Sequence, residues 1–285
     1  MKAPDFAYER PETIEAALTA LAAGGDARLL AGGQSLVPML NFRVAAPALV
    51  IDINRIPGLD AIEEAGDVVR VGALVRHAAL ERSELVARAL PLVHEVMPLI
   101  GHAAIRSRGT IGGSLALADP AAELPACMIA LDATIVARSA ALERRIAASD
   151  FFRGIYLTAL GPDEMIVAVE IPKQAGRRHA FREMARRHGD YAIAGLAMTA
   201  PAGGALDDAR IVFFGVADRP FRATAAEAAV AGLPAGAEAG EQAAAALASE
   251  LVPEGDLNAP PAMKLHLAKI LLRRAVADLA AEAGR

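Results

Sequence analysis

Two pairs of adjacent glycines are the residues whose types and spacing point most directly to chemistry. The first pair, Gly32 and Gly33, ends an apolar run and is followed at once by Gln34 and Ser35. A glycine turn between a buried strand and a helix leaves backbone N–H groups uncovered, and the positive end of the helix dipole faces the same way. The stretch therefore has the character of an anion site that suits a phosphate.

The first pair alone also fits an ordinary turn, because Gly-Gly after a strand is common there. The stretch "LLAGGQSLVPML", residues 29–40, lacks the G-x-G-x-x-G spacing of dinucleotide-binding folds and the Gly-Lys-Ser/Thr of a P-loop. A phosphate site therefore needs support from elsewhere in the chain.

That support is a second glycine turn in "IRSRGTIGGSLALADPAAELP", residues 105–125. Thr110, Gly112, Gly113 and Ser114 bring small residues and hydroxyl groups to one turn, and we expect free backbone amides there as well. Two such turns, each flanked by buried segments, predict a clamp that holds the two phosphates of a dinucleotide from opposite sides.

The elements that position these turns follow from hydrophobic periodicity and from glycine and proline breaks. Around the first turn we expect a helix over 13–23 opened by Thr13, a strand over 27–31, a short helix containing Pro38, and a strand over 48–53. Later we expect a β segment over 67–75, one or two helices within 77–100, and a helix and then a strand within 120–137. After these we expect a strand ending at Pro172, alternating strands beyond it, and a terminal helix over 263–284.

Composition bounds the class of protein. A chain of 285 residues is long enough for two or three modest domains. The formal net charge of -5 argues against nucleic-acid binding, which needs a concentrated basic face. No apolar run approaches the roughly 20 residues that cross a bilayer, and the N-terminal stretch has no apolar signal core. We therefore expect a cytoplasmic protein without a membrane span.

The cysteine count restricts the cofactors that this chain can hold. Cys127 is the only cysteine, so the chain alone can build no disulfide, thiolate-bound iron–sulfur cluster or structural zinc site. Its apolar neighbours predict a small core residue. The six histidines lack metal-ligand spacing, and we predict no metal site.

Taken together, "AGGQSL" and "RGTIGGSLALADPAAELP" resemble the FAD-binding medium subunit of molybdenum hydroxylases, the family of carbon monoxide dehydrogenase and xanthine dehydrogenase. The flanks match in order: an acidic residue ten positions past the second glycine pair, a strand ending "VEIP", and then Arg-Arg-x-Gly-Asp-Tyr-Ala. The resemblance covers essentially the whole chain. It implies an α+β fold, with a two-lobed FAD-binding domain of the vanillyl-alcohol oxidase (PCMH) type over 1–174, lobes of about 1–56 and 57–174, and a smaller α+β C-terminal domain over 175–285.

The resemblance also implies which residues hold a non-covalent FAD. Residues 29–36 would run along the pyrophosphate, and residues 110–114 would clamp it from the other side. Glu123 would lie near the ribityl or ribose hydroxyls, with a dipole-stabilised carboxylate at a helix N-terminus as the alternative. Ile105 and the Ile166 backbone would flank the cofactor. The predicted cofactor-binding set is Leu29, Leu30, Ala31, Gly32, Gly33, Gln34, Ser35, Leu36, Ile105, Thr110, Ile111, Gly112, Gly113, Ser114, Glu123, Ile166 and Tyr191.

Tyr191 enters this set by scarcity. The chain has no tryptophan and three tyrosines, Tyr8, Tyr156 and Tyr191, so few side chains can stack on or hydrogen-bond to an isoalloxazine ring. Tyr191 alone sits in a stretch that resembles the family pattern, which places it near the flavin ring or the route of the electron acceptor. A core tyrosine whose hydroxyl is satisfied by backbone is the alternative.

The implied function is electron transfer within a complex. A large subunit would oxidise a substrate at a molybdenum cofactor, a small subunit would carry electrons through two 2Fe-2S clusters, and FAD here would pass them to an external acceptor. The assembly implied is a dimer of heterotrimers. We expect no catalytic side chain, because the flavin supplies the redox chemistry. Residues 175–285 would serve assembly, so that their deletion leaves a flavin-binding fragment.

Two other functions fit the same residues. A stand-alone flavin-dependent oxidoreductase on the same fold would need substrate-binding and proton-donating groups over the flavin and would turn over by itself. A non-catalytic nucleotide-binding assembly protein would be colourless after purification. Gln34 bears on the substrate, since relatives that oxidise carbon monoxide often carry His there, and carbon monoxide is therefore disfavoured.

Overall fold

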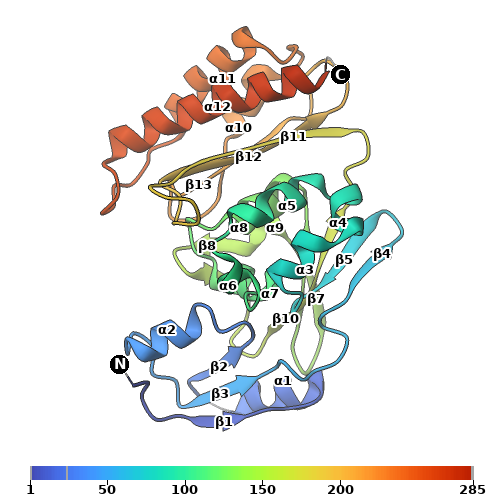
Figure 1. The fold of residues 1–285 in the computed structure, drawn as a ribbon, viewed down its shortest axis with the longest axis vertical. Coiled ribbons are helices and arrows are strands. Elements are labelled where there is room, and N and C mark those ends of the chain that lie inside the picture. The colour runs from blue at the N-terminus through green and yellow to red at the C-terminus, as the bar shows by residue number, and fades with distance from the viewer. Residues whose placement is uncertain (1, 24, 284–285) are drawn as a thin grey trace.

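The computed structural model describes residues 2–23 and 25–283 and stacks three blocks along its longest axis. In Figure 1 an N-terminal lobe lies at the bottom, a second lobe in the middle, and a sheet covered by long helices at the top. Every block combines strands and helices, so the predicted α+β class is confirmed.

The N-terminal lobe is built on a parallel sheet of three strands in the order β1-β3-β2. Its elements are β1 (Ala7–Glu9), α1 (Ile14–Ala23), β2 (Ala27–Leu30), α2 (Leu36–Asn41) and β3 (Leu49–Asp52). Thr13 opens α1 as predicted, because its hydroxyl oxygen accepts a hydrogen bond from the N–H of Ala16 at 3.1 Å. Parallel pairing of β2 with β3 brings their carboxyl ends to one edge, so the first glycine turn lies beside residues 53–54.

The second lobe contains an antiparallel sheet of five strands in the order β4-β5-β10-β6-β7. Its strands are β4 (Ile62–Ala65), β5 (Val68–Gly72), β6 (Thr134–Arg138), β7 (Glu143–Ala147) and β10 (Met165–Pro172), with the small hairpin β8 (Phe152–Gly154) and β9 (Leu157–Thr158). Its helices are α3 (His77–Arg82), α4 (Glu84–Ala89), α5 (Pro91–Val96), the 3-10 helix Met97–Leu99, α6 (Ala103–Arg106), α7 (Ile111–Leu117), α8 (Glu123–Ala130) and α9 (Ala148–Phe151).

The expectation of one or two helices within 77–100 was wrong. The segment forms three short α-helices and a 3-10 helix, because two breaks divide it. Ser83 is extended and its hydroxyl oxygen accepts from the N–H of Val86 at 3.3 Å, which starts α4 anew. Pro91 starts α5, since proline fits the first helical turn but not a helix interior.

The C-terminal block is an antiparallel sheet of four strands in sequence order, followed by helices. Its elements are β11 (Arg177–Met184), β12 (Ala194–Pro201), β13 (Arg210–Phe214), β14 (Phe221–Arg222), α10 (Thr224–Val230), α11 (Ala237–Glu250) and α12 (Pro261–Ala283). The terminal helix is therefore as predicted, and Gly284 lies outside the described residues. No helix among the described residues is long and apolar enough to cross a membrane.

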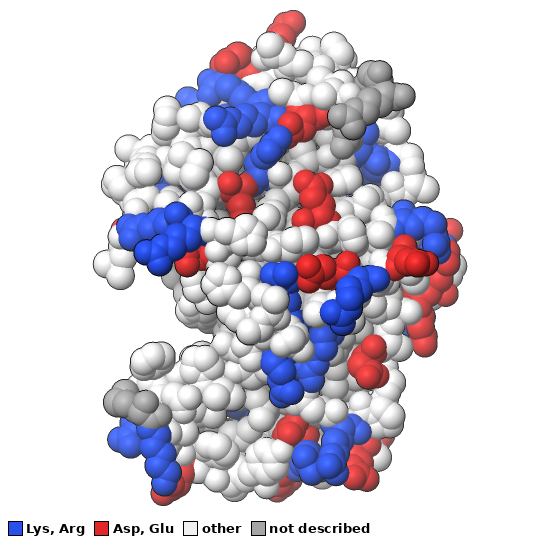
Figure 2. Space-filling view, in the orientation of Figure 1, with Lys and Arg blue, Asp and Glu red and all other residues white. Residues whose placement is uncertain are grey.

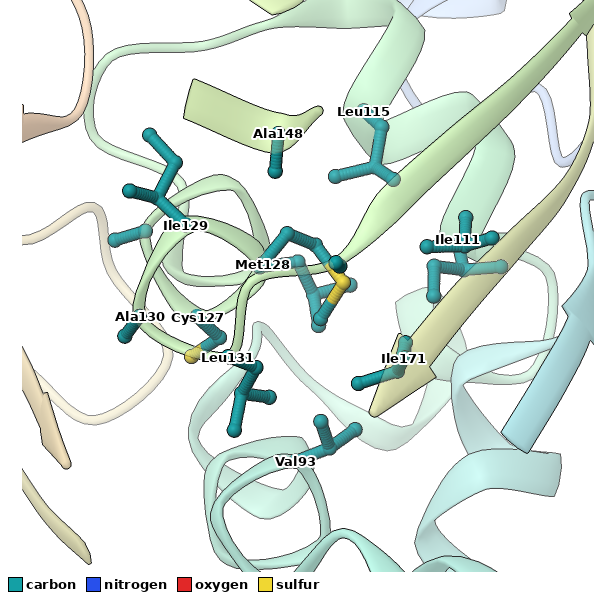
Figure 3. Packing of buried hydrophobic residues seen from close by; sticks show 14 of the residues in the cluster. Val93, Ile111, Leu115, Cys127, Met128, Ile129, Ala130, Leu131, Ala148 and Ile171 are labelled. Atoms are coloured by element: carbon teal, nitrogen blue, oxygen red, sulfur yellow. The ribbon is translucent and has the colours of Figure 1, made fainter. Parts of the chain in front are cut away.

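Helix α8 joins the second lobe to the C-terminal sheet. All of its residues are buried, and one hydrophobic cluster includes most of them together with Phe181, Ala197 and Phe214 of the sheet. Figure 3 shows Cys127 and Met128 of α8 among side chains of the second lobe, which confirms Cys127 as a core residue. The helices α10 to α12 cover the opposite face of the same sheet and form a core of their own with it.

This shared core leads to a prediction about residues 175–285. A chain ending at residue 174 would expose α8 to water, and the loss of apolar burial costs about 25 cal/mol per Å². We expect that fragment to be insoluble or to melt without a cooperative transition, whereas the full chain melts cooperatively in calorimetry. A soluble fragment with a cooperative transition would restore the idea that these residues serve assembly alone.

Candidate cofactor site

The first glycine turn, residues 31–35, carries a run of unused backbone donors. Gly33 has a φ of +73°, a conformation that glycine adopts freely and that turns the chain from β2 into α2. The N–H groups from Gly33 to Leu36 donate to no atom of the described residues, and the next one, of Val37, donates to the carbonyl of Gly33 at 3.1 Å. Consecutive free donors at a helix start are suited to an anion.

The second glycine turn, residues 108–114, differs from the expectation of free amides. Thr110 caps α7, and the N–H groups of residues 111–114 donate to oxygen atoms of Val75, Ala73 and Thr110 at 2.9–3.1 Å. The expectation was wrong because the start of α7 is docked against residues 73–75, and docking uses its donors. The Ser114 side chain and the positive end of α7 remain available to a ligand.

The glycines of the second turn therefore serve packing. A Cβ on Gly112 would lie 2.6 Å from the Cβ of Ala73, closer than real Cβ atoms approach. A Cβ on Gly113 would lie 2.8 Å from the Thr110 hydroxyl oxygen and 4.0 Å from the Cβ of Ala31 in the first turn.

The two turns lie against each other although they come from different lobes. A Cβ on Gly32 would lie 2.9 Å from the Cα of Gly109, so this approach of two backbones requires glycine. Figure 2 shows a hollow at the left between the N-terminal lobe and the rest of the molecule, with walls largely free of charged side chains on the displayed face. The arrangement sets free backbone donors beside a second helix start, and it can hold an elongated phosphate ligand between lobes.

The structure places Ile105 and the loop that carries Tyr191 near the second glycine turn. Ile105 lies on α6 and is 39% exposed, and Tyr191 lies in the loop between β11 and β12 and is 66% exposed. That loop packs on the segment before α6, since a Cβ on Gly189 would lie 2.9 Å from the carbonyl oxygen of Gly101. The Tyr191 hydroxyl is partly desolvated although the side chain as a whole is exposed, and this desolvation, followed by the charges of Asp119 and Glu123, raises the pKa of Tyr191.

Glu123 belongs to an acidic group with Asp119 and Glu183. Glu123 is the first residue of α8 and is 8% exposed, and burial, with the charges of Glu183 and Asp119, raises its pKa to about 7. Burial also raises the pKa of Glu183 to about 7, and its Oε2 atom has no hydrogen-bond partner among the described residues. Carboxyl groups of this kind exchange a proton near neutral pH.

Ile166 and the leucines that flank the first turn are more buried than Ile105 and Tyr191. Ile166 is 5% exposed in β10, and its side chain is part of the central core. Leu29 packs against an apolar core that the N-terminal lobe shares with β6 and β10 of the second lobe, and Leu30 and Leu36 are half-buried.

Sequence reasoning missed three residues beside the turns. Asn54 donates to the carbonyls of Leu30 and Ala31 just before the first glycine pair, and Arg76 donates to the carbonyl of Arg108 in the second turn. His77 is 5% exposed beneath Gly109, and burial lowers its pKa to about 4. Asn54 had a usable signal, since it follows a strand parallel to the one that ends in the glycine turn.

Two family models match the two parts of the chain separately. Residues 4–174 match the family model of the FAD binding domain in molybdopterin dehydrogenase, and residues 179–279 match that of the CO dehydrogenase flavoprotein C-terminal domain. The 6-hydroxypseudooxynicotine dehydrogenase complex subunit alpha of Paenarthrobacter nicotinovorans is 46% identical over 231 residues, which are 80% of this chain and 78% of that protein. The carbon monoxide dehydrogenase medium chain of Hydrogenophaga pseudoflava is 36% identical over 276 residues, 96% of each protein.

Solved structures agree over the whole length. A chain of carbon monoxide dehydrogenase from Hydrogenophaga pseudoflava, in a form that lacks the Mo-pyranopterin moiety, matches with a TM-score of 0.95, 38% identity and 99% coverage of both chains. A chain of quinoline 2-oxidoreductase from Pseudomonas putida 86 matches with a TM-score of 0.95, 36% identity and 100% coverage of both chains.

The acidic group predicts how stability depends on pH. A carboxyl whose folded pKa is raised stabilises the fold below its unfolded pKa and loses that contribution as pH rises through about 7. Between pH 6.5 and 8.5 folded His77 is neutral, whereas unfolded His77 still loses part of a proton near pH 6.5, which adds a smaller change of opposite sign. The two carboxyls of the acidic group therefore dominate this window. We expect the ligand-free chain to lose thermal stability from pH 6.5 to 8.5 and Glu123→Gln to lose less of it.

The matched control is Glu143→Gln, at an exposed position of β7. It should follow the wild-type melting temperatures across the same window. Parallel wild-type and Glu123→Gln profiles would contradict the assignment of a raised pKa to Glu123.

Proposed function

The chain belongs to the family of FAD-binding medium subunits of molybdenum hydroxylases, and from that membership we propose that it binds one non-covalent FAD and transfers electrons through it. The observation that carries the proposal is the run of free N–H groups from Gly33 to Leu36, set against the second glycine turn at the boundary between the lobes. Free donors at a helix start are what a pyrophosphate needs, and the family is defined by FAD binding.

The residues that would hold the cofactor divide by role. Residues 29–36 would bind the pyrophosphate through backbone donors, and residues 110–114 would close over it with small side chains and the Ser114 hydroxyl. Glu123 would accept from ribityl or ribose hydroxyls, for which its buried carboxyl has no competing side-chain donor in the described chain. Ile105, Tyr191 and the Ile166 backbone would border the ring.

Bound FAD would supply the redox chemistry, collecting electrons from iron–sulfur clusters and giving them to an external acceptor. The chain itself would exclude water, orient the cofactor and hold a proton in the acidic group near neutral pH. No side chain needs to act as nucleophile or metal ligand for this role.

The partners that we propose are a large molybdenum-cofactor subunit and a small iron–sulfur subunit, assembled as a dimer of heterotrimers. The single cysteine, Cys127, is buried in the core and cannot ligate a cluster, so the clusters belong on another chain. Within this chain we propose domains over 1–174 and 175–285, with β10 ending at Pro172 and β11 beginning at Arg177.

Valine substitutions in the two turns test the cofactor assignment. Gly33→Val places a β-branched side chain at positive φ, and its Cβ would lie 3.2 Å from Val37. Gly113→Val would displace the Thr110 hydroxyl that caps α7. The valine at 33 would cover the free N–H groups of the first turn, and the valine at 113 would shift the start of α7. Loss of hydrogen bonding worth about 1–3 kcal/mol predicts that each variant binds FAD about tenfold or more weakly, measured by fluorescence titration and by acid-released flavin.

The control is Gly204→Val, because an added Cβ there meets nothing within 4 Å. It should keep the flavin content of the wild type. Equal flavin content in all three variants would refute the phosphate assignment, and a wild-type chain that binds no FAD would refute the proposed function.

Tyr191→Phe tests the placement of that residue beside the flavin. The variant should keep its FAD content and its rate of reduction by substrate, because the ring remains. Loss of the hydrogen bond that the Tyr191 hydroxyl would make to the flavin or to its acceptor predicts that flavin reoxidation slows about two- to tenfold, measured by stopped-flow on the complete complex. An unchanged reoxidation rate, or a joint fall in stability and flavin content, would assign Tyr191 a structural role.

A further inference from the structure

A continuous set of hydrogen bonds connects the two glycine turns through Asn54 and Arg76, which lie in neither turn. Asn54 follows β3 in the N-terminal lobe. Its side-chain nitrogen lies 3.2 Å from the carbonyl oxygen of Leu30 and 2.8 Å from that of Ala31, the last two before the glycines. Asp52 fixes the amide in turn, since its Oδ1 atom accepts from the side chain and from the backbone N–H of Asn54 at 2.6 and 3.0 Å.

Arg76 belongs to the second lobe and reaches both sides. Its Nη2 atom donates to the Oδ1 atom of Asn54 at 2.5 Å, and its Nη1 atom donates to the carbonyl oxygen of Arg108. The backbone of Arg76 is also tied to the second turn, because it forms an isolated antiparallel β-bridge with Thr110. The N–H of the next residue, His77, donates to the carbonyl of Gly109 at 2.9 Å. One guanidinium group thus spans the boundary between the lobes.

We propose that Asn54 and Arg76 form a brace that fixes the separation of the two glycine turns and thereby sets the affinity for ligands that carry a diphosphate. Both are positioning residues, acting through the turns. The inference rests on the proposed function, since FAD is the diphosphate ligand concerned.

The distance between the two glycine turns is determined by a backbone contact and by side-chain hydrogen bonds together. The backbone contact between Gly32 and Gly109 keeps the turns from moving closer. Among the described residues no strand pairing joins the first turn to the second. The lobes share an apolar core, and at the turns themselves the side chains of Asn54 and Arg76 oppose their moving apart. A clamp for a ligand of fixed length needs both limits, because a displacement of about 1 Å weakens well-aligned hydrogen bonds.

The charge of Arg76 is a separate contribution that the test must isolate. Both of its partners are uncharged oxygen atoms, so they leave its positive charge unneutralised, and that charge would attract a diphosphate directly. Arg76→Lys keeps the charge but cannot donate to two acceptors in a fixed fork, whereas Asn54→Ala removes the brace without changing charge.

The experiment measures FAD binding by fluorescence titration and ADP binding by competition with FAD, on the full chain. We expect Asn54→Ala and Arg76→Lys each to weaken FAD binding at least tenfold, and ADP, which lacks the flavin ring, by a similar factor. The double variant should be no more than threefold weaker than the weaker single variant, because both remove one brace.

The matched control is Arg28→Lys, at an arginine of β2 that pairs with Asp26 at 3.2 Å and lies outside the turns. It should bind FAD within twofold of the wild type. The ligand-free melting temperatures of Arg76→Lys and Arg28→Lys should agree within a few degrees, so that lost affinity is separated from lost stability. Arg76→Lys carries the test by itself if Asn54→Ala does not fold.

Two results would overturn the brace. Wild-type affinity in Arg76→Lys together with weak binding in Arg76→Gln would show that charge alone matters. Independent, additive losses in the double variant would show that Asn54 and Arg76 do not act as one unit. A wild-type chain without FAD affinity would instead refute the proposed function, so the two failures are distinguishable.

Discussion

The contact on which the rest of the site depends is the approach of two backbones, at Gly32 in one lobe and Gly109 in the other. Any side chain at Gly32 would separate the lobes, since its Cβ would lie 2.9 Å from the facing Cα. The contact is useful only if both turns are presented at the same edge. Parallel pairing of β2 with β3 does this for the first turn, and docking of α7 on residues 73–75 does it for the second.

The two turns are chemically unequal. In the first, the N–H groups from Gly33 to Leu36 are free, because the chain turns away from its strand before the helix closes. In the second, the corresponding donors are used in docking α7, so its glycines serve close packing. One turn can therefore bind an anion while the other supplies a rigid wall, and the hydrogen bonds of Asn54 and Arg76 hold the two together.

The C-terminal block also contributes to the site. It packs on α8, which carries Glu123, and it holds the loop before that helix, because the N–H of Gly215 donates to the carbonyl of Pro120 at 2.8 Å. The buried Lys264 of α12 fixes Gly215 in turn, donating to its carbonyl at 2.7 Å. The acidic group thus depends on both halves of the chain, with Glu123 from the second lobe and Glu183 from β11.

The sequence by itself determined the features that depend on neighbouring residues. These features include the strand, glycine turn and helix around Gly33, the cap at Thr13 and the buried Cys127. They also include the paired motifs that identify the family. Tertiary structure alone decided which amides stay free and that Arg76 meets Asn54, which lies 22 positions away in another lobe. The physical reason is that caps and turns form within a few residues, whereas a donor's final acceptor depends on which distant segment packs against it.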